Sequence, residues 1–262
     1  MPSVSRAAVI TIDRGGVEQA LARVRAVAED CGVEIVEGDD ADIAVVLGGD
    51  GTMLRALARF LGTGVPVIGV NYGRVGFLTA IGSDELEEGV RRVFHGEYMT
   101  IQLATLEAQL DGERHFAVND VVVAGGTPGR IIELGYSIGG EELGHQPCDG
   151  LICATPTGST AYNLSNGGPV LVWGLEAVAI TFIAPHALVI RPLVVPRGPD
   201  VTITNLTPDV GTAVLVDGVP VGKLAYGEQT TVRVSDQHCV LATLPEVTFF
   251  TRYAATFGRE PP

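Results

Sequence analysis

The stretch 48–52, Gly-Gly-Asp-Gly-Thr, places a carboxylate among three glycines, directly after the apolar run 43–47. That run is typical of a buried parallel strand, and helical spacing resumes at Met53. Glycines let backbone N–H groups approach a phosphate, and a helix start favours negative charge. Because a phosphate repels a carboxylate, Asp50 is expected to order a metal ion or to take a proton from a hydroxyl nucleophile. The alternative is a tight turn in which Asp50 or Thr52 caps the helix.

A second glycine-rich loop, residues 69–78, ends another apolar run, 65–70. Its glycines have the spacing G-x-x-x-G-x-x-G, which is not the dinucleotide-binding fingerprint. Since the carboxyl ends of parallel strands share one edge of a sheet, we expect this loop near Asp50. A plain turn is the alternative.

The third stretch, residues 148–165, contains a strand, a turn dense in hydroxyl groups and a short helix. Hydroxyl and amide donors at a helix start suit phosphate or ribose oxygens. Tyr162 could stack on a base, which contributes roughly 1–3 kcal/mol in other base-binding sites. The alternative is that Thr and Ser side chains cap the helix while Tyr162 lies in the core.

The elements that must position these residues change character near Gly96. Before it, strands and helices alternate, which predicts a Rossmann-like α/β domain over residues 1–97. After it, short strand-like runs with turn signals predict an all-β domain of the sandwich type over residues 98–245. The expected strands are 7–12, 33–36, 43–47, 65–70, 101–110, 115–123, 131–138, 201–205, 213–216, 230–234 and 240–244, and the expected helices are 17–28, the stretch after Asp50, and 84–94.

Composition narrows the class of protein. The chain has 262 residues, 46% of them apolar, and a net charge of −14, so it is globular and acidic. The negative charge argues against nucleic-acid and anionic-membrane partners. Four cysteines without a C-x-x-C pair, together with the lack of a signal-peptide apolar region, predict a cytoplasmic protein with reduced thiols. The longest apolar run, 178–190, contains Pro185 and is too short to cross a bilayer.

In their order along the chain, these motifs resemble the signature of NAD kinases. The resemblance covers roughly residues 42–220. Its first motif is shared with diacylglycerol kinases, sphingosine kinases and 6-phosphofructokinases, whereas the block 155–162, Thr-Pro-Thr-Gly-Ser-Thr-Ala-Tyr, is highly specific. The remaining matches are Asn71 to Leu78, Asn119-Asp120, Asp149-Gly150, Pro185 to Leu188, Arg191-Pro192 and, in an Asp-Gly pair, Asp217.

The resemblance implies a fold and an activity. It implies an N-terminal α/β domain and a C-terminal β domain, with the tail 246–262 returning to the first. It implies transfer of the γ-phosphoryl group of ATP, or of polyphosphate, to the adenosine 2′-hydroxyl of NAD. The implied cofactor is Mg²⁺ or another divalent cation carried by ATP, with no protein metal ligands, and the implied assembly is a homodimer or homotetramer.

Carried over position by position, the resemblance makes Asp50 the base that accepts the 2′-hydroxyl proton. Asp149 is implied to contact the nicotinamide end, often across a subunit boundary. The family usually has Asn-Glu where this chain has Asn119-Asp120, so the side chain of Asp120 reaches one methylene less toward the ribose. The residues implied to bind NAD or ATP are Gly49, Gly51, Thr52, Arg55, Phe77, Asn119, Asp120, Asp149, Thr157, Thr160, Ala161, Tyr162, Ser165 and Asp217.

Two other functions share parts of this pattern. A diacylglycerol-type lipid kinase with the Gly-Gly-Asp-Gly-Thr turn needs an apolar or basic membrane-facing surface, and the sequence indicates neither. A non-catalytic dinucleotide sensor keeps the pocket but does not need Asp50. Arg55 and Arg74 are candidates for extra positive charge at the phosphates, although a solvated surface position is favoured for each.

Overall fold

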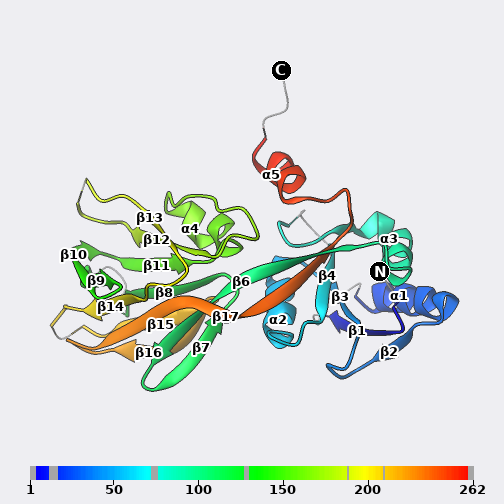
Figure 1. Ribbon diagram of the computed structural model, residues 1–262, viewed down its shortest axis with the longest axis horizontal. Helices are drawn as coiled ribbons and strands as arrows, with labels where there is room; N and C mark the ends of the chain where they lie inside the picture. Colours follow the sequence, from blue (N-terminus) through cyan, green and yellow to red (C-terminus); the bar gives the residue numbers. More distant parts are fainter. Residues whose placement is uncertain are drawn as a thin grey trace. The chain divides into compact units, whose positions relative to one another are not determined.

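The computed structural model describes residues 4–11, 17–71, 76–126, 130–187, 189–208 and 210–258. Of the sequence motifs, residues 72–75, which include Arg74, and Leu188 lie outside these ranges. The chain divides into two compact units, one formed by Met1–Gln102 with Cys239–Pro262 and the other by Leu103–His238 (Figure 1).

A parallel sheet forms the centre of the first unit, with strand order β2-β1-β3-β4 and the end of β17 beside β4. Every residue of β3 is buried, which explains its unbroken apolar sequence. The α/β prediction for this part of the chain is therefore confirmed. The elements are β1 (Arg6–Thr11), α1 (Val17–Cys31), β2 (Glu34–Val36), β3 (Ile43–Leu47), α2 (Asp50–Arg59), β4 (Pro66–Asn71), β5 (Ile81–Gly82), a 3₁₀ turn (Ser83–Glu85), α3 (Leu86–Phe94) and α5 (Phe249–Phe257).

Helices cover both faces of this sheet (Figure 1). Alternate residues of a strand point to opposite faces. Ile43, Val45 and Leu47 join one core with the buried sides of α1 and α3. The helix α2 packs against β3 and β4 and buries Met53 and Leu57. The strand β3 therefore runs through the covered centre of this unit. Asp50 lies just beyond its end, where α2 begins.

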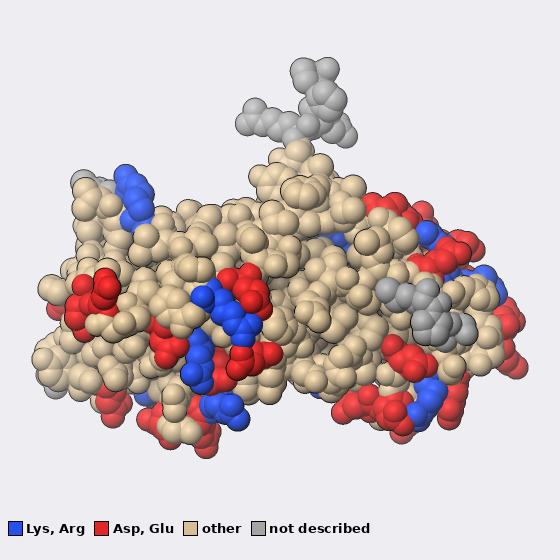
Figure 2. Space-filling view, viewed as in Figure 1, with Lys and Arg blue, Asp and Glu red and all other residues tan. Residues whose placement is uncertain are grey.

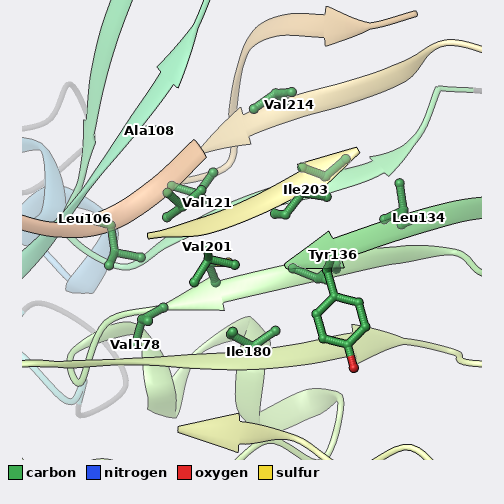
Figure 3. Packing of buried hydrophobic residues seen from close by; sticks show 14 of the residues in the cluster. Leu106, Ala108, Val121, Leu134, Tyr136, Val178, Ile180, Val201, Ile203 and Val214 are labelled. Atoms are coloured by element: carbon green, nitrogen blue, oxygen red, sulfur yellow. The ribbon is translucent and has the colours of Figure 1, made fainter. Parts of the chain in front are cut away.

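The second unit is a sandwich of two sheets, as the sequence predicts. One sheet has the order β10-β9-β14-β17 with β6 and β7, and the other has the order β13-β12-β11-β8-β15-β16. Buried side chains from both sheets fill the space between them (Figure 3). The strands are β6 (Met99–Leu110), β7 (Glu113–Ala117), β8 (Asp120–Gly125), β9 (Ile132–Ile138), β10 (Glu141–Cys148), β11 (Gly150–Ala154), β12 (Ala177–Ile183), β13 (Leu193–Pro196), β14 (Val201–Asn205), β15 (Thr212–Val216), β16 (Val219–Leu224) and β17 (Gln229–Thr243).

The outer face of the second sheet is also covered, which positions the hydroxyl-rich turn. Val122, Ile152 and Ala179 form a second, smaller core with Leu171 from the segment that follows the turn. All five residues of β11 are buried as a result. The turn itself continues as a 3₁₀ helix (Gly158–Thr160) and the short helix α4 (Tyr162–Ser165).

One sequence prediction is wrong in an informative way. The expected strands 230–234 and 240–244 are a single strand, β17, that runs through the polar residues between them. Its first half pairs with β14, with Val232 opposite Val201, and its second half pairs with β4, with Val240 opposite Pro66. Because each half has its own partner strand, no turn is needed between the halves, and β17 carries the chain from one unit into the other.

On the face seen in Figure 2, many charged side chains lie in groups of both signs, and a few groups of one sign stand alone. Arg197, for example, donates to Glu176 at 2.8 Å and also pairs with Asp236. Such exposed pairs contribute little stability, but they leave basic groups neutralised by acidic neighbours. Among the described residues, no helix is long and apolar enough to cross a membrane.

Candidate active site

Asp50 is the first residue of α2, and its carboxylate is held by a different loop. The residue before the helix, Gly49, has an extended backbone, and no side chain caps the start of this helix. Instead, Oδ2 of Asp50 accepts a hydrogen bond from the N–H of Phe77 at 2.7 Å, and Oδ1 accepts one from Leu78 at 3.0 Å. The alternative in which Asp50 or Thr52 caps the helix is therefore wrong.

Glycine is required where the two loops meet. A Cβ atom added to Gly76 would overlap the Asp50 carboxylate, so a larger residue there would displace it. On the other side, Cβ atoms added to Gly49 or Gly51 would meet nothing within 4 Å. The start of α2 thus combines a fixed carboxylate with open space beside backbone N–H groups, an arrangement that suits an anionic ligand.

The other predicted residues of this unit differ in exposure. Phe77 is buried beside Asp50, and its ring meets Phe249 of α5 edge-on, with 5.4 Å between centroids. Arg55 is exposed on α2, so it can reach solvent near the helix start. Thr52 is only 4% exposed, and its side chain faces Gly48. It therefore points into the protein, away from the open side of the turn.

Sequence reasoning missed Arg252, which lies on α5 with 5% of its surface exposed. Its Nη1 donates to the carbonyl oxygen of Phe77 at 2.8 Å and to that of Thr79, and its Nη2 donates to Oγ1 of Thr243 at 3.2 Å. Burial lowers the pKa of Arg252 to about 10, and the nearby Asp50 carboxylate opposes this shift. A lone basic residue in the aromatic stretch 249–257 was the available signal.

In the second unit, Asp217 organises the loop that precedes β8. It lies in the left-handed region, with φ of 48°, at the turn between β15 and β16. Its carboxylate accepts hydrogen bonds from the backbone N–H groups of Val118 at 2.8 Å, Asn119 at 2.7 Å and Asp120 at 3.1 Å. Burial raises the pKa of Asp217, while the three N–H donors lower it. Both carboxylate oxygens of Asp217 are thus committed to the loop backbone.

The loop held by Asp217 carries Asn119 and Asp120. Asp120 is 6% exposed, and burial together with the Asp217 charge raises its pKa to about 7. Oδ1 of Asn119 is buried and, among the described residues, has no hydrogen-bond partner. A buried acceptor without a partner costs free energy, so the backbone contacts around Asn119 must offset this cost.

The hydroxyl-rich turn lies against the same loop. Oγ1 of Thr155 donates to the carbonyl of Val118 at 2.6 Å and accepts from the N–H of Gly158 at 2.9 Å. A Cβ atom on Gly158 would overlap the carbonyl of Asn119. Oγ1 of Thr157 is a second buried polar atom that has no partner within the described part of the chain. These contacts bring the turn and the loop 118–120 together.

The remaining predicted residues of the turn lie at its surface. Thr160 is half-buried and donates to the carbonyl of Thr157 at 3.2 Å. Ala161 is half-buried, and Ser165 is exposed. The Tyr162 side chain is 46% exposed, so the alternative that places it in the core is wrong, and its ring is free to stack on a ligand.

Sequence reasoning also missed Asn163, which supports this turn from inside. It is fully buried, and its carboxamide donates to the carbonyls of Ser159 and Pro169, both at 3.0 Å. Its Oδ1 accepts from Oγ1 of Thr181 at 2.7 Å. A polar residue inside a short helix was the signal, because such a side chain needs buried partners.

Asp149 lies apart from these residues. It is exposed and precedes β11, whereas the hydroxyl-rich turn follows that strand. Five residues at about 3.3 Å each separate the two ends by on the order of 17 Å. Asp149 therefore does not join the group formed by Asn119, Asp120 and Tyr162 in one chain.

Comparison with known proteins matches most of this chain to one family. The models described as the ATP-NAD kinase N-terminal and C-terminal domains match residues 16–98 and 118–244. An NAD kinase of Gemmatimonas aurantiaca is 37% identical over 233 residues, which are 87% of this chain and 81% of that protein.

Two solved structures share the fold. The crystal structure of an NAD kinase from Archaeoglobus fulgidus in complex with ATP has a TM-score of 0.79 at 27% identity, over 97% of each chain. The crystal structure of yeast NADH kinase complexed with NADH has a TM-score of 0.85 over all of this chain and 90% of that one. At 22% identity, the likeness to the yeast enzyme supports the fold alone.

Proposed function

We propose, from the premise that this chain belongs to the NAD kinase family, that Asp50 is its catalytic base and ATP its phosphoryl donor. Family membership makes the chain an enzyme that phosphorylates NAD. The roles of individual residues, the donor and the cation are part of the proposal.

The observation that carries the proposal is the carboxylate of Asp50, held by the N–H groups of Phe77 and Leu78 at an open, glycine-lined helix start. In the proposed step, this carboxylate takes the proton of the adenosine 2′-hydroxyl. The 2′-oxygen forms the new bond to the γ-phosphorus while the bond to the β–γ bridging oxygen breaks, and ADP leaves. Gly49, Gly51 and Arg55 are proposed to bind phosphate oxygens.

The second unit is proposed to bind the ribose and the bases of the dinucleotide. Oδ1 of Asn119 and the carboxyl of Asp120 suit ribose hydroxyls, and Tyr162 offers an exposed ring for stacking on adenine. Thr157, Thr160, Ala161 and Ser165 are proposed to line the adenine and ribose pockets, Phe77 the nicotinamide half. Because Asp149 lies at the far end of β11, we propose that it serves the nicotinamide end of a site in a neighbouring subunit.

A divalent cation is proposed to enter with the nucleotide. Among the described residues, no group of three or more His, Cys, Asp or Glu side chains could hold a metal ion. In an acidic protein with a net charge of −14, a cation such as Mg²⁺ would neutralise the triphosphate during transfer.

The proposal extends to the setting of the enzyme. We propose a homodimer or homotetramer in the cytoplasm, acting on NAD with ATP or polyphosphate. All four cysteines are free thiols, which suits a reducing compartment.

The reaction is tested by incubating the purified chain with NAD, ATP and Mg²⁺ and measuring NADP with an NADP-specific enzyme. We expect NADP to form, to depend on NAD and ATP, and to stop when EDTA removes the cation. Parallel reactions with polyphosphate and with diacylglycerol vesicles separate the donors and the lipid-kinase alternative. A folded sample that phosphorylates the lipid and makes no NADP from either donor would overturn the proposal.

The role of Asp50 is tested with Asp50→Asn, which keeps the shape of the side chain and removes the base. We expect turnover to fall roughly 10²- to 10⁴-fold, with little change in NAD affinity. The melting temperature, measured on the same preparation, controls for folding. Turnover within about threefold of the unchanged protein, far inside the range for a lost base, would rule out the catalytic role.

A further inference from the structure

A single peptide unit connects Arg252 with Asp50. The carbonyl of Phe77 accepts a hydrogen bond from Nη1 of Arg252 at 2.8 Å, and the N–H of the same peptide, that of Leu78, donates to Oδ1 of Asp50 at 3.0 Å. The carbonyl of Thr79 is held by Arg252 as well. The loop 77–79, whose N–H groups bind Asp50, is thus also bound through its carbonyl groups by the buried guanidinium of Arg252.

We infer that Arg252 is a positioning residue for phosphoryl transfer, acting on Asp50 through the loop 77–79. The inference rests on the proposed role of Asp50 as the base. Hydrogen bonds in a chain polarise one another, so a guanidinium on the carbonyl of Phe77 strengthens the donor that the adjoining N–H presents to Asp50. The helix α5, from the end of the chain, thereby becomes part of the support of the catalytic turn.

A purely structural role explains this arrangement less well. The helix α5 also packs on the loop through its own rings, because Phe249 meets the ring of Phe77 at 5.4 Å between centroids and Phe257 meets it at 6.2 Å. Burying a cation is costly, and apolar residues of similar volume often stabilise such a position at least as well. Arg252 instead directs its donors at two carbonyls of the one loop that holds Asp50.

The first part of the test compares Arg252→Gln, which removes the charge, with Arg252→Lys, which keeps it. We expect Arg252→Gln to lower kcat by about 10²-fold, as a small misplacement of a catalytic group does, and to leave KM for NAD within about threefold. Arg252→Lys should recover part of the loss. The matched control is Arg23→Lys. Arg23 of α1 also donates to a carboxylate, that of Glu87, and to a backbone carbonyl, that of Ser83. This variant should leave kcat unchanged.

The second part is a double-mutant cycle with Asp50→Asn. If Arg252 acts through Asp50, adding Arg252→Gln to Asp50→Asn should lower kcat by less than about threefold further, so the two losses do not multiply. A residue that only stabilises the fold would lower the amount of folded enzyme equally in both backgrounds. Melting temperature and the kcat per folded molecule, corrected by circular dichroism, separate these effects.

The outcomes distinguish the inference from the function on which it rests. Full turnover of Asp50→Asn would overturn the role of Asp50 and, with it, the inference. A strong loss in Asp50→Asn with normal kcat in Arg252→Gln would overturn the inference alone. Losses that multiply fully in the double variant would also overturn it. If Arg252→Gln does not fold, the same cycle is run with Arg252→Lys.

Discussion

Two carboxylates in this chain differ because of their neighbours. Asp50 is half-buried, and two backbone N–H groups donate to its oxygens. Asp120 is buried, with the Asp217 charge beside it, and its pKa rises to about 7. Burial and a like charge favour the protonated form of the Asp120 carboxyl. At the residue scale, the two positions are therefore suited to different tasks.

The raised pKa of Asp120 predicts a pH dependence of stability. The folded chain holds the Asp120 proton up to about pH 7, whereas the unfolded chain releases it near the ordinary value of 3.8. This contribution to stability is present in full below about 3.8 and is lost as the pH rises to about 7. In urea unfolding near pH 5.5 and near pH 8.5, the unchanged protein should lose on the order of 2 kcal/mol more than Asp120→Asn between the two values. An equal change in both proteins would contradict this prediction.

At the element scale, turns and a helix from distant parts of the chain support the site. The turn between β15 and β16 supplies Asp217, which holds the loop before β8. The helix α5 supplies Arg252, which holds the loop after β4. In each unit, a charged side chain from a later element binds the backbone of the loop that carries the predicted site residues.

Asp217→Asn tests the support of the loop 118–120. Asn tolerates the left-handed backbone of this position, but its carboxamide offers one oxygen where the carboxylate offers two. With a buried N–H group left unpaired, we expect a loss of about 1–3 kcal/mol in urea unfolding and weaker NAD binding in a titration.

The control for Asp217→Asn is Asp111→Asn. Asp111 has φ of 50° and precedes a glycine in a hairpin turn, as Asp217 does, but it is exposed. It should lose neither stability nor NAD affinity. If both variants behave alike, the carboxylate of Asp217 does not hold the loop.

At the scale of the whole molecule, exposed aromatic side chains lie along one face of α5. Phe250 is 67% exposed, Tyr253 42% and Phe257 39%, at spacings that bring them to the same side of the helix. Single exposed apolar residues are ordinary, whereas a row of three large ones is the kind of surface that protein–protein interfaces use. The exposed Asp149, remote from the other site residues, also suits a site completed by a neighbouring subunit.

We therefore predict a homodimer or homotetramer at micromolar concentration. Sedimentation equilibrium should give a mass of two or four chains. The association should survive high salt, because apolar contacts are not screened. Sedimentation as a monomer in the same buffer in which the enzyme has full activity would count against the prediction.

The sequence by itself determined the features that depend on neighbouring residues. Alternating strands and helices, the buried run 43–47 and the glycines around Asp50 predict an α/β unit with a carboxylate at a helix start, and the structure has it there. The short strand-like runs with turn signals after Gly96 likewise predict a sandwich, and the structure has two packed sheets there. Strand, helix and turn preferences are properties of a few consecutive residues, so they are readable from the chain alone.

Only the tertiary structure decided which groups hold the site residues. The donors to Asp50 lie 27 and 28 residues away along the chain, and Arg252 binds a carbonyl 175 residues away. By sequence, the polar residues in the middle of β17 indicate a turn. Only the pairing of each half with its own partner strand shows that the strand is continuous. Arg252 and Asn163 carry no local signal of their partners, because packing between distant segments determines which buried donors and acceptors meet.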